Sequence, residues 1–526
     1  MTSHLGVINL AAFFILLLLP LMLSSSGEDG DLTEPDPTPE PDPGTDPDPI
    51  PEPGPDIERT GLTVSDDLFG VNAHFTVSTD SGVPTDNFQS GIDAFQFEEF
   101  RFPAGRGELR AEGLDWEDGV DWLDVTELTD EGNLRPELVE FLNGVNGDVT
   151  LVIPTTNASL DEYGDGFAEW AEILLNEYGD QIQAFEIGNE YWSRMGETEY
   201  GQYANIAIQE LARGIENAID GDPQIIVQMA SPIGSSDFGP DFDDRPFYTR
   251  LDAANHAIID QLSAQAKLNV DGVVEHYYWS QSSIPFDDSS AEIRHMDKDL
   301  RVWESRFEQE LDFYITEWNL RAGNCTCNGM PVLSIYVEMV QNMVELGVDV
   351  AHIWPMAHNI STDIGGPADD TGVDTDDEGR VTETLRGAIF DIMSETLPGK
   401  ELIYVDVPGM PEGFTIAAYE GDGEHVFFVT NATMGVLNAN IDLSEIVPNL
   451  SRIETTQIGY DPDSSDGLRY VPGEGRVPAT SVEINGTDYY LNEHDVRAEF
   501  TDATYTSEDF DVSFLPFELL VIRAFS

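Results

Sequence analysis

Positive charge is scarce in this sequence of 526 residues, which has 23 lysine and arginine residues against 101 aspartate and glutamate residues. The formal net charge is −78 at pH 7, and the lysines are limited to Lys267, Lys298 and Lys400. A polyanionic surface repels nucleic acid and anionic membranes, so we expect neither as a partner. We interpret the acidity as an adaptation to salty surroundings, where screening weakens the self-repulsion, and we expect a halotolerant protein.

Cysteine is nearly absent, since Cys325 and Cys327 are the only two. A Cys-x-Cys pair cannot join distant parts of a fold, so it is either a local loop clip or two free thiols. A metal site would need more ligands than this loop offers. The acidic stretch 369–378 also lacks a calcium-binding glutamate, because the twelfth position counted from Asp374 is Leu385. We therefore expect no metal and no other cofactor.

The N-terminal residues do not read as part of a folded domain. Residues 1–27 contain the apolar run 5–23, which predicts a secretion signal or an uncleaved membrane anchor. Both interpretations stay open because no Lys or Arg precedes the run and no Ala-x-Ala site follows it. Residues 28–58 alternate proline with acidic residues, which predicts a disordered, extended spacer. We expect an extracellular or surface-anchored protein that contacts a membrane only through a possible anchor in residues 1–27, and the oligomeric state is open.

Residues 59–399 alternate strand-like apolar runs with amphipathic helical stretches, the pattern of a parallel α/β fold. No glycine-rich phosphate loop follows the first run, which argues against a nucleotide-binding open sheet. Eight βα units of this kind predict a (β/α)8 TIM barrel. The expected strands are 68–75, 97–102, 149–154, 184–190, 225–230, 272–278, 313–317 and 350–355, and the expected helices include 166–178, 199–219, 251–265, 332–346 and 382–397.

Residues 400–526 have a different texture. Short alternating strands are separated by turns such as Gly421-Asp422-Gly423 and Asn485-Gly486. This pattern predicts an all-β sandwich that follows the barrel. Residues 62–64 could add one more strand to it from the N-terminal side.

Two apolar, aromatic-rich segments, 183–192 and 311–319, are the most informative part of the sequence. Each reads as a buried parallel strand, and each ends in a carboxylate, Glu190 in the first and Glu317 in the second. Barrel enzymes hold their catalytic groups at the carboxyl ends of the strands. Two carboxyl groups that face each other there, one acting as acid and the other as nucleophile, are the catalytic apparatus of a retaining glycosidase.

On these residues the chain resembles the clan A glycoside hydrolases, which are retaining (β/α)8-barrel glycosidases. In that clan the acid/base glutamate follows an asparagine at the end of the fourth strand, and the nucleophile ends the seventh. Counting the expected strands places Asn189 and Glu190 on the fourth and Glu317 on the seventh. The segment 101–105, Arg-Phe-Pro-Ala-Gly, resembles the second-strand motif of arabinofuranosidases and heparanase-like glucuronidases, with Ala104 in place of its first glycine.

The resemblance implies that Glu190 is the acid/base and Glu317 the nucleophile. Asn189 is expected to bind the 2-hydroxyl of the sugar. His276 and Tyr278 are two residues apart on the sixth strand and so share one face, which we expect to be the inner face beside Glu317. A hydrogen bond from the Tyr278 hydroxyl would keep that carboxylate ionised. The alternative is that His276 and Tyr278 are ordinary core residues.

Three further residues complete the expected site. Arg101 is expected to bind Glu317 from the second strand. Trp192 and Trp354 offer flat apolar faces on which a sugar can stack, although either could be a core aromatic residue instead. Glu186 lies deeper on the fourth strand and is expected to make a buried contact with an arginine.

The sequence thus predicts an exported retaining glycoside hydrolase that acts on oligosaccharides or polysaccharides. The segment 101–105 and the segment 116–119 favour an arabinofuranosidase-like or glucuronidase-like exo-enzyme. A β-xylosidase-like or endo-acting enzyme is the alternative, and a non-catalytic carbohydrate-binding surface protein is the alternative of another class. The sugar stays open, because loop residues that no motif reveals select it.

Overall fold

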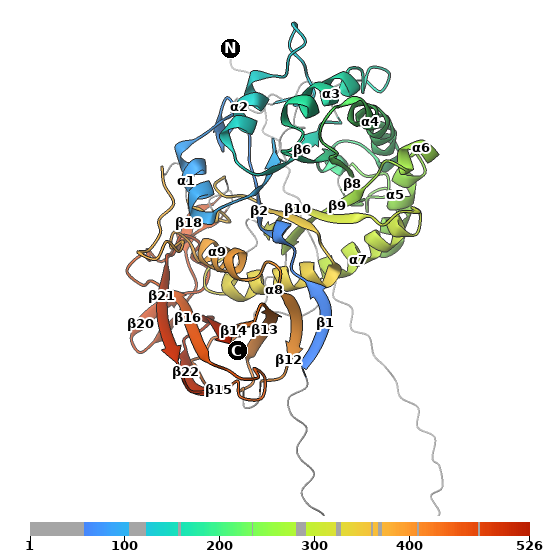
Figure 1. Cartoon of the computed structure of the whole chain (residues 1–526). Helices are drawn as coiled ribbons and strands as arrows, with labels where there is room; N and C mark the ends of the chain where they lie inside the picture. The colour runs from blue at the N-terminus through green and yellow to red at the C-terminus, as the bar shows by residue number, and fades with distance from the viewer. Residues whose placement is uncertain are drawn as a thin grey trace, which may run out of the picture. The chain divides into compact units, whose positions relative to one another are not determined.

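The computed structural model describes residues 57–526 except 105–122, 156–158, 234, 280–290, 322–327, 359–360, 367–370, 408–409 and 472–473. Within the described residues, parallel strands that follow one another in the chain close into a barrel, so the predicted TIM barrel is confirmed (Figure 1). Its strands are β2 (Gly70–Asn72), β5 (Glu99–Phe102), β6 (Asp148–Ile153), β7 (Ile182–Ile187), β8 (Gln224–Gln228), β9 (Gly272–Trp279), β10 (Asp312–Leu320) and β11 (Val350–Ile353).

Helices surround the barrel in the positions that the sequence pattern predicts (Figure 1). Helix α8 has the expected bounds and ends at Gly347, whose positive φ of 72° suits a glycine after a helix. The expected helix 251–265 is instead two helices, because the Ser263 side chain caps a new turn. The helices are α1 (Asp86–Phe95), α2 (Pro136–Gly144), α3 (Phe167–Tyr178), α4 (Glu197–Asn217), α5 (Phe247–Ile259), α6 (Ala264–Lys267), α7 (Ala291–Glu304), α8 (Val332–Leu346) and α9 (Leu385–Thr396).

Among the helices of the described part of the chain, none combines the length and the apolar character that a bilayer crossing requires. The apolar run 5–23 lies outside the described residues.

The C-terminal strands form the predicted β-sandwich. One antiparallel sheet has the order β1, β12, β13, β14, β23, β16, β21, and a second, smaller sheet pairs β15 with β22. Ile403 and Phe427 of the first sheet share an apolar core with Ile441 and Phe510 of the second. The bounds are β1 (Ile57–Thr63), β12 (Glu401–Val405), β13 (Phe414–Gly421), β14 (Glu424–Asn431), β15 (Leu437–Asp442), β16 (Arg452–Tyr460), β21 (Ala498–Tyr505), β22 (Asp509–Phe514) and β23 (Leu519–Phe525).

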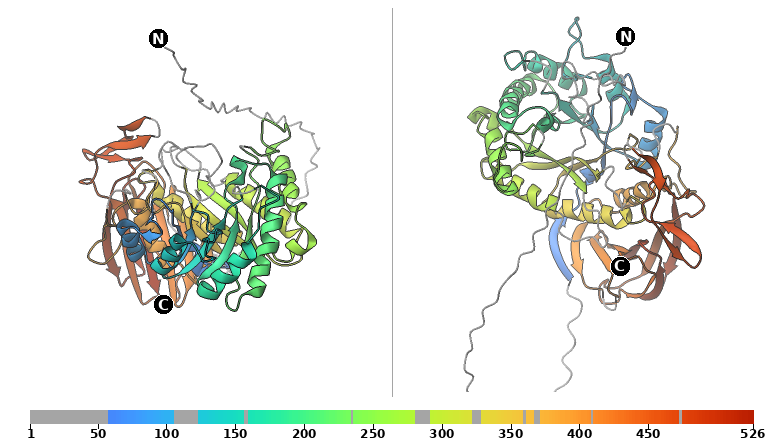
Figure 2. Two further views of the ribbon diagram at one scale, coloured as in Figure 1. Left: turned by 90° about the horizontal axis from the view of Figure 1, so that it is seen from above. Right: turned by 180° about the vertical axis from the view of Figure 1, so that it is seen from behind.

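Strand β1 precedes the barrel in the chain but belongs to the C-terminal sheet. It pairs antiparallel with β12, with Ile57 opposite Val405 and Arg59 opposite Ile403. Two views of the ribbon show this N-terminal strand beside β12, against helix α8 (Figures 1 and 2). The strand expected at 62–64 is therefore part of a longer strand that begins at Ile57.

A buried acid lies at the N-terminal end of the second barrel strand. Glu99 begins β5 and is buried, and its neighbours include Asp67 and Asp148. Burial and the negative charges of these two aspartates raise the pKa of Glu99 to about 9. At pH values between the ordinary pKa of a glutamate and about 9, Glu99 keeps its proton in the folded chain but loses it in the unfolded chain. Stability must therefore fall as pH rises through this window.

We expect the free energy of unfolding to decrease from pH 5 to pH 9, with a contribution from Glu99 of at most about 1.4 kcal/mol per pH unit. Glu99→Gln removes this titration and should flatten the pH dependence. Glu177→Gln, a change at an exposed helix position, is the matched control and should leave the pH dependence of the free energy of unfolding as in the wild type. Urea unfolding at a series of pH values measures this, and equal pH slopes for Glu99→Gln and the wild type would contradict the explanation.

Candidate active site

Glu190 lies just beyond the fourth barrel strand. The sequence places it on a strand 184–190, but β7 ends at Ile187, so that boundary is wrong. The reason lies in the backbone: Gly188 and Glu190 both adopt left-handed conformations, with φ values of 79° and 45°, which end the extended strand. Glutamate rarely adopts this conformation, and such strain is found most often at functional sites. The turn leaves the Glu190 side chain 42% exposed.

Glu317 lies within the seventh barrel strand, which continues past it to Leu320. The expected strand end at 317 is therefore wrong, because residues 318–320 continue to pair with β9. The strand also contains a bulge. Ile315 pairs with Glu275 and Glu317 with His276, so Thr316 is an extra residue that has no partner on β9. The bulge places Glu317 opposite His276, and its side chain is only 7% exposed.

The two glutamates meet at the mouth of the barrel. Three atoms lie within 4.8 Å of one another: a carboxylate oxygen of Glu190, a carboxylate oxygen of Glu317 and a ring nitrogen of His276. Glu190 is open to solvent and Glu317 is enclosed, so the two chemically similar groups have different surroundings.

Arg101 is the centre of the hydrogen-bond network beneath the pair. Its guanidinium is fully buried and donates to both oxygens of Glu186, at 2.6 and 2.8 Å, and to Oε1 of Glu317 at 2.8 Å. It also donates to Oδ1 of Asn189 at 2.6 Å and to Oδ1 of Asn72 at 2.9 Å. The expected contacts of Arg101 with Glu317 and of Glu186 with an arginine are thus confirmed.

His276 and Tyr278 both reach the carboxylates of this site from β9, as their spacing predicts. The Tyr278 hydroxyl donates to Oε2 of Glu317 at 2.7 Å. Nδ1 of His276 lies 3.3 Å from Oε1 of Glu190 and 3.5 Å from Oε2 of Glu317. The imidazole therefore stands between the two glutamates.

These neighbours determine the ionisation of the enclosed groups. Burial alone would raise the pKa of Glu317, but the charges of His276 and Arg101 and the hydrogen bond from Tyr278 hold it below its ordinary value. Burial alone would lower the pKa of His276, but the two carboxylates raise it above its ordinary value. Glu317 is thus an ionised carboxylate, which is the state a nucleophile requires.

The two tryptophans expected in the site are both buried. Trp192 packs edge-on against His276, with 6.1 Å between the ring centroids. Trp354 follows β11 and packs against His74 and His358. Stacking of a sugar on either ring stays a prediction, as does the contact of Asn189 with a sugar hydroxyl.

Two residues of this network were not predicted from the sequence. Asn72 ends β2 and binds Arg101, and Gln228 ends β8 and lies 3.3 Å from His276. Both are polar residues at the carboxyl end of an apolar run, which is the signal that identified Glu190. Ala104, which replaces a glycine of the resembled motif, has a left-handed φ of 63° that glycine adopts more readily. The segment 116–119 and both cysteines lie outside the described residues.

Solved structures of glycoside hydrolases are similar to this chain, although no protein-family model and no curated protein sequence matches it. A family 51 α-L-arabinofuranosidase from Bifidobacterium longum has a TM-score of 0.56 and 11% sequence identity, with coverage of 89% of this chain and 98% of the arabinofuranosidase. The chain has the fold of barrel glycoside hydrolases.

Two further structures share this fold. A 4-O-α-L-rhamnosyl-β-D-glucuronidase from Fusarium oxysporum has a TM-score of 0.52 at 12% identity and covers 89% of this chain and 98% of its own. A bifunctional glucanase-xylanase from a metagenome library has a TM-score of 0.51 at 11% identity, and the match covers 90% of this chain and 100% of the glucanase-xylanase. The resemblance predicted from the sequence is confirmed at the level of the fold.

The carboxylates and imidazole of the site also form a set of atoms close enough to hold a metal ion. However, Arg101 and Tyr278 already donate to the two oxygens of Glu317, so this donor set fits hydrogen bonding better than metal ligation. A second set, Asp466, Glu493 and Asp495, is bound in part by Arg476.

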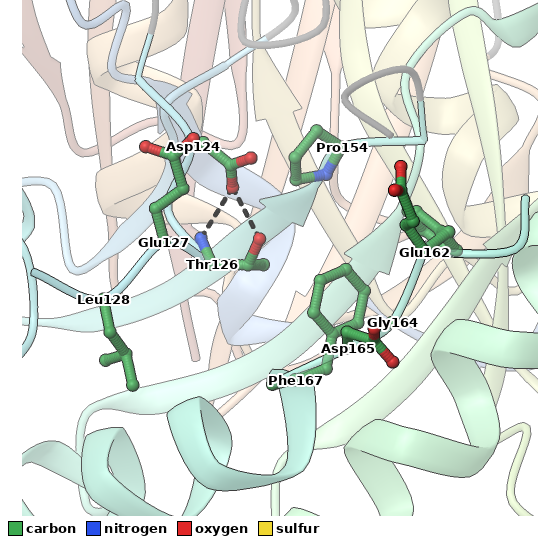
Figure 3. A pocket seen from close by; sticks show the side chains of 11 residues that line it. Asp124, Thr126, Glu127, Leu128, Pro154, Glu162, Gly164, Asp165 and Phe167 are labelled. Atoms are coloured by element: carbon green, nitrogen blue, oxygen red, sulfur yellow. Dashed lines mark hydrogen bonds between the residues drawn. The ribbon is translucent and has the colours of Figure 1, made fainter. Parts of the chain in front are cut away.

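A separate pocket of about 330 Å³ opens beside the end of β6 (Figure 3). Asp124 and Glu162 flank Pro154, and the Phe167 ring lies below it. None of the predicted site residues lines this pocket.

Arg101 should matter to the fold as well as to the site. Arg101→Met leaves the carboxylates of Glu186 and Glu317 buried without a cation, which costs about 3–5 kcal/mol. Adding Glu186→Leu removes one of those charges and should recover part of the loss. Arg213→Met removes an exposed partner of Glu210 and should cost at most about 1 kcal/mol. Chemical denaturation tests this, and similar losses for the two arginine variants would contradict it.

Proposed function

We propose that this protein is an exported retaining glycoside hydrolase that cleaves oligosaccharides or polysaccharides by double displacement. The observation that carries the proposal is the approach of Glu190 and Glu317 to within 4.8 Å, oxygen to oxygen, at the barrel mouth. Retaining glycosidases hold their carboxyl groups about 5–5.5 Å apart, whereas inverting ones leave about 6.5–9.5 Å for a water molecule.

In the first step, Glu317 attacks the anomeric carbon while Glu190 gives its proton to the leaving glycosidic oxygen. The bond from the anomeric carbon to that oxygen breaks, and an ester to Glu317 forms. In the second step, Glu190 takes a proton from water, and the resulting hydroxide displaces Glu317. The different exposures support this division, because the accessible Glu190 can exchange protons with solvent and the enclosed Glu317 cannot.

For specificity we favour exo-action of the arabinofuranosidase or glucuronidase type. The 101–105 segment supports this interpretation, and an arabinofuranosidase and a glucuronidase are among the structures with the same fold. A β-xylosidase-like or endo-acting enzyme is the second candidate, because the glucanase-xylanase also shares the fold. We place the enzyme outside the cell or on its surface.

A screen of aryl glycosides tests this proposal. The panel includes α-L-arabinofuranosides, β-D-glucuronides and β-D-xylosides, each at low and at molar sodium chloride, with the Glu317→Gln variant as the control for contaminating activity. We expect one sugar to be released by the wild type and not by the variant, with activity retained at molar salt. Binding of oligosaccharides without release of any sugar would instead support the non-catalytic alternative.

A further inference from the structure

Gln228 lies beside His276 but away from the proposed reaction centre. It is the last residue of β8, its side chain is fully buried, and its backbone N–H donates to the Tyr200 hydroxyl at 3.0 Å. Its amide nitrogen lies 3.3 Å from Nε2 of His276. No donor among the described residues lies within hydrogen-bonding distance of its amide oxygen.

This contact allows two hydrogen-bonding arrangements, because the two ends of an amide are interchanged by a half-turn. With the nitrogen toward the ring, the amide donates to an unprotonated Nε2, and the neutral ring carries its proton on Nδ1. With the oxygen toward the ring, the amide accepts from Nε2, and the ring can be a doubly protonated imidazolium. The amide oxygen could also accept from a neutral ring protonated on Nε2, but that ring would turn the lone pair of Nδ1 toward Glu190 and Glu317, so the two carboxylates disfavour it.

We propose that Gln228 is a positioning residue of the active site: its amide binds Nε2 of His276 and keeps a proton on Nδ1, the nitrogen that faces Glu190 and Glu317. This inference rests on the proposed function for its catalytic consequence, but its structural core concerns the protonation of His276 alone. The amide presents its nitrogen to the neutral ring and its oxygen to the charged ring.

The position of this proton matters because Nδ1 lies 3.3 Å from one carboxylate and 3.5 Å from the other. An Nδ1–H group donates to these oxygens and stabilises the negative charge of Glu317 before attack. If the neutral ring carried its proton on Nε2, the lone pair of Nδ1 would point at the two carboxylates and repel them. Without Gln228, the neutral ring loses the amide donor that the structure places beside Nε2, and the preference for a proton on Nδ1 weakens.

The charged groups around His276 come from three strands, the turn after β7 and a helix. Glu190 and Glu317 favour the charged ring, and Arg101 disfavours it. Glu275 accepts from the backbone N–H of His276 at 3.3 Å, and its side chain is hydrogen-bonded to that of Asp299 in α7. Burial raises the pKa of Glu275 to about 7, so its proton must be followed separately in any titration of this site.

The test uses nitrogen-15 NMR of the histidine ring nitrogens across pH, in the full chain labelled at histidine. The signals of His276 among the nine histidines are assigned from their loss in His276→Gln. Gln228→Met keeps the size and flexibility of the side chain and removes both polar atoms. Gln228→Glu keeps only acceptors, and Gln224→Leu removes a glutamine from the other end of the same strand as the matched control.

In the wild type we expect the neutral His276 ring to carry its proton on Nδ1, and this spectrum is decisive even if a Gln228 variant fails to fold. Gln228→Met should move the population toward the Nε2–H form and lower the pKa of His276 by about one unit. Gln228→Glu should raise that pKa by about one unit or more. Gln224→Leu should leave both quantities as in the wild type.

Turnover provides the second readout once a substrate is known. Above the pKa of His276, kcat of Gln228→Met should be about tenfold below that of the wild type, with KM unchanged, and below that pKa the two should agree. A loss of equal size at every pH would indicate a merely structural role and overturn the proposal. So would a wild-type ring with its proton on Nε2, or spectra that Gln228→Met leaves unchanged. Because the spectra need no substrate, they separate this inference from the proposed function.

Discussion

Replacing Glu317 by glutamine is expected to lower kcat by about 10⁴-fold or more, the scale on which removal of one member of a catalytic unit acts. The amide is close in shape to the carboxylate but cannot attack the anomeric carbon, so no ester forms. The fold should persist, because Arg101 keeps its two hydrogen bonds to Glu186. Initial rates on the best aryl glycoside, with circular dichroism to confirm folding, measure the effect.

Tyr278→Phe is the matched control for this experiment. It leaves Glu317 in place and removes only the hydroxyl that donates to Oε2. We expect a much smaller loss, about tenfold, because one hydrogen bond to a charged group disappears while the nucleophile remains. If the Glu317 variant kept more activity than the Tyr278 variant, Glu317 could not be the nucleophile.

Glu190→Ala is expected to act selectively. Substrates with poor leaving groups need a proton on the departing oxygen, so their kcat should fall by about 10²–10⁴-fold. Dinitrophenyl glycosides need no such proton, and formation of their ester with Glu317 should stay fast. Hydrolysis of that ester should then become limiting, since no base activates the water. A burst of dinitrophenol followed by a slow steady state is the expected measurement.

Azide distinguishes the two glutamates by stereochemistry. In Glu190→Ala, azide attacks the ester between the sugar and Glu317 without the help of a base. The anomeric carbon is then inverted twice, so the glycosyl azide should have the configuration of the substrate. In Glu317→Ala, azide can enter the space left by the nucleophile and attack the substrate directly, so the product should be inverted. NMR of the two azides gives the answer. The assignments fail if both variants give the same configuration or if azide rescues neither.

The barrel could be predicted because its signals in the sequence are local. Each strand is an apolar run bounded by polar residues, and counting these runs along the chain places Glu190 and Glu317 at the fourth and seventh strands. The two-residue spacing of His276 and Tyr278 likewise predicts that both side chains lie on one face. The approach of both to Glu317 follows from this regularity.

The details of the site could not be predicted in the same way, because they depend on contacts between distant segments. The bulge at Thr316 appears only when β10 is paired with β9, and it decides which residue of β9 faces Glu317. The left-handed turn at Glu190 overrides the apolar pattern that extends the strand to this residue. Gln228 looks like any polar residue at a strand end until His276 is placed beside it.

The central claim, that Glu317 becomes covalently bound to the sugar, is tested most directly by trapping that ester. The reagent is a 2-deoxy-2-fluoro glycoside of the sugar found in the screen, with a dinitrophenyl leaving group. The fluorine slows both formation and hydrolysis of the ester, but the good leaving group keeps formation faster than hydrolysis, so the ester accumulates. Mass spectrometry of the intact chain should show the addition of one fluoroglycosyl group, and peptide analysis should place it on Glu317. The Glu317→Gln variant should remain unlabelled. Turnover of the parent glycoside with an inverted product and no label, or a label on another residue, would contradict the account.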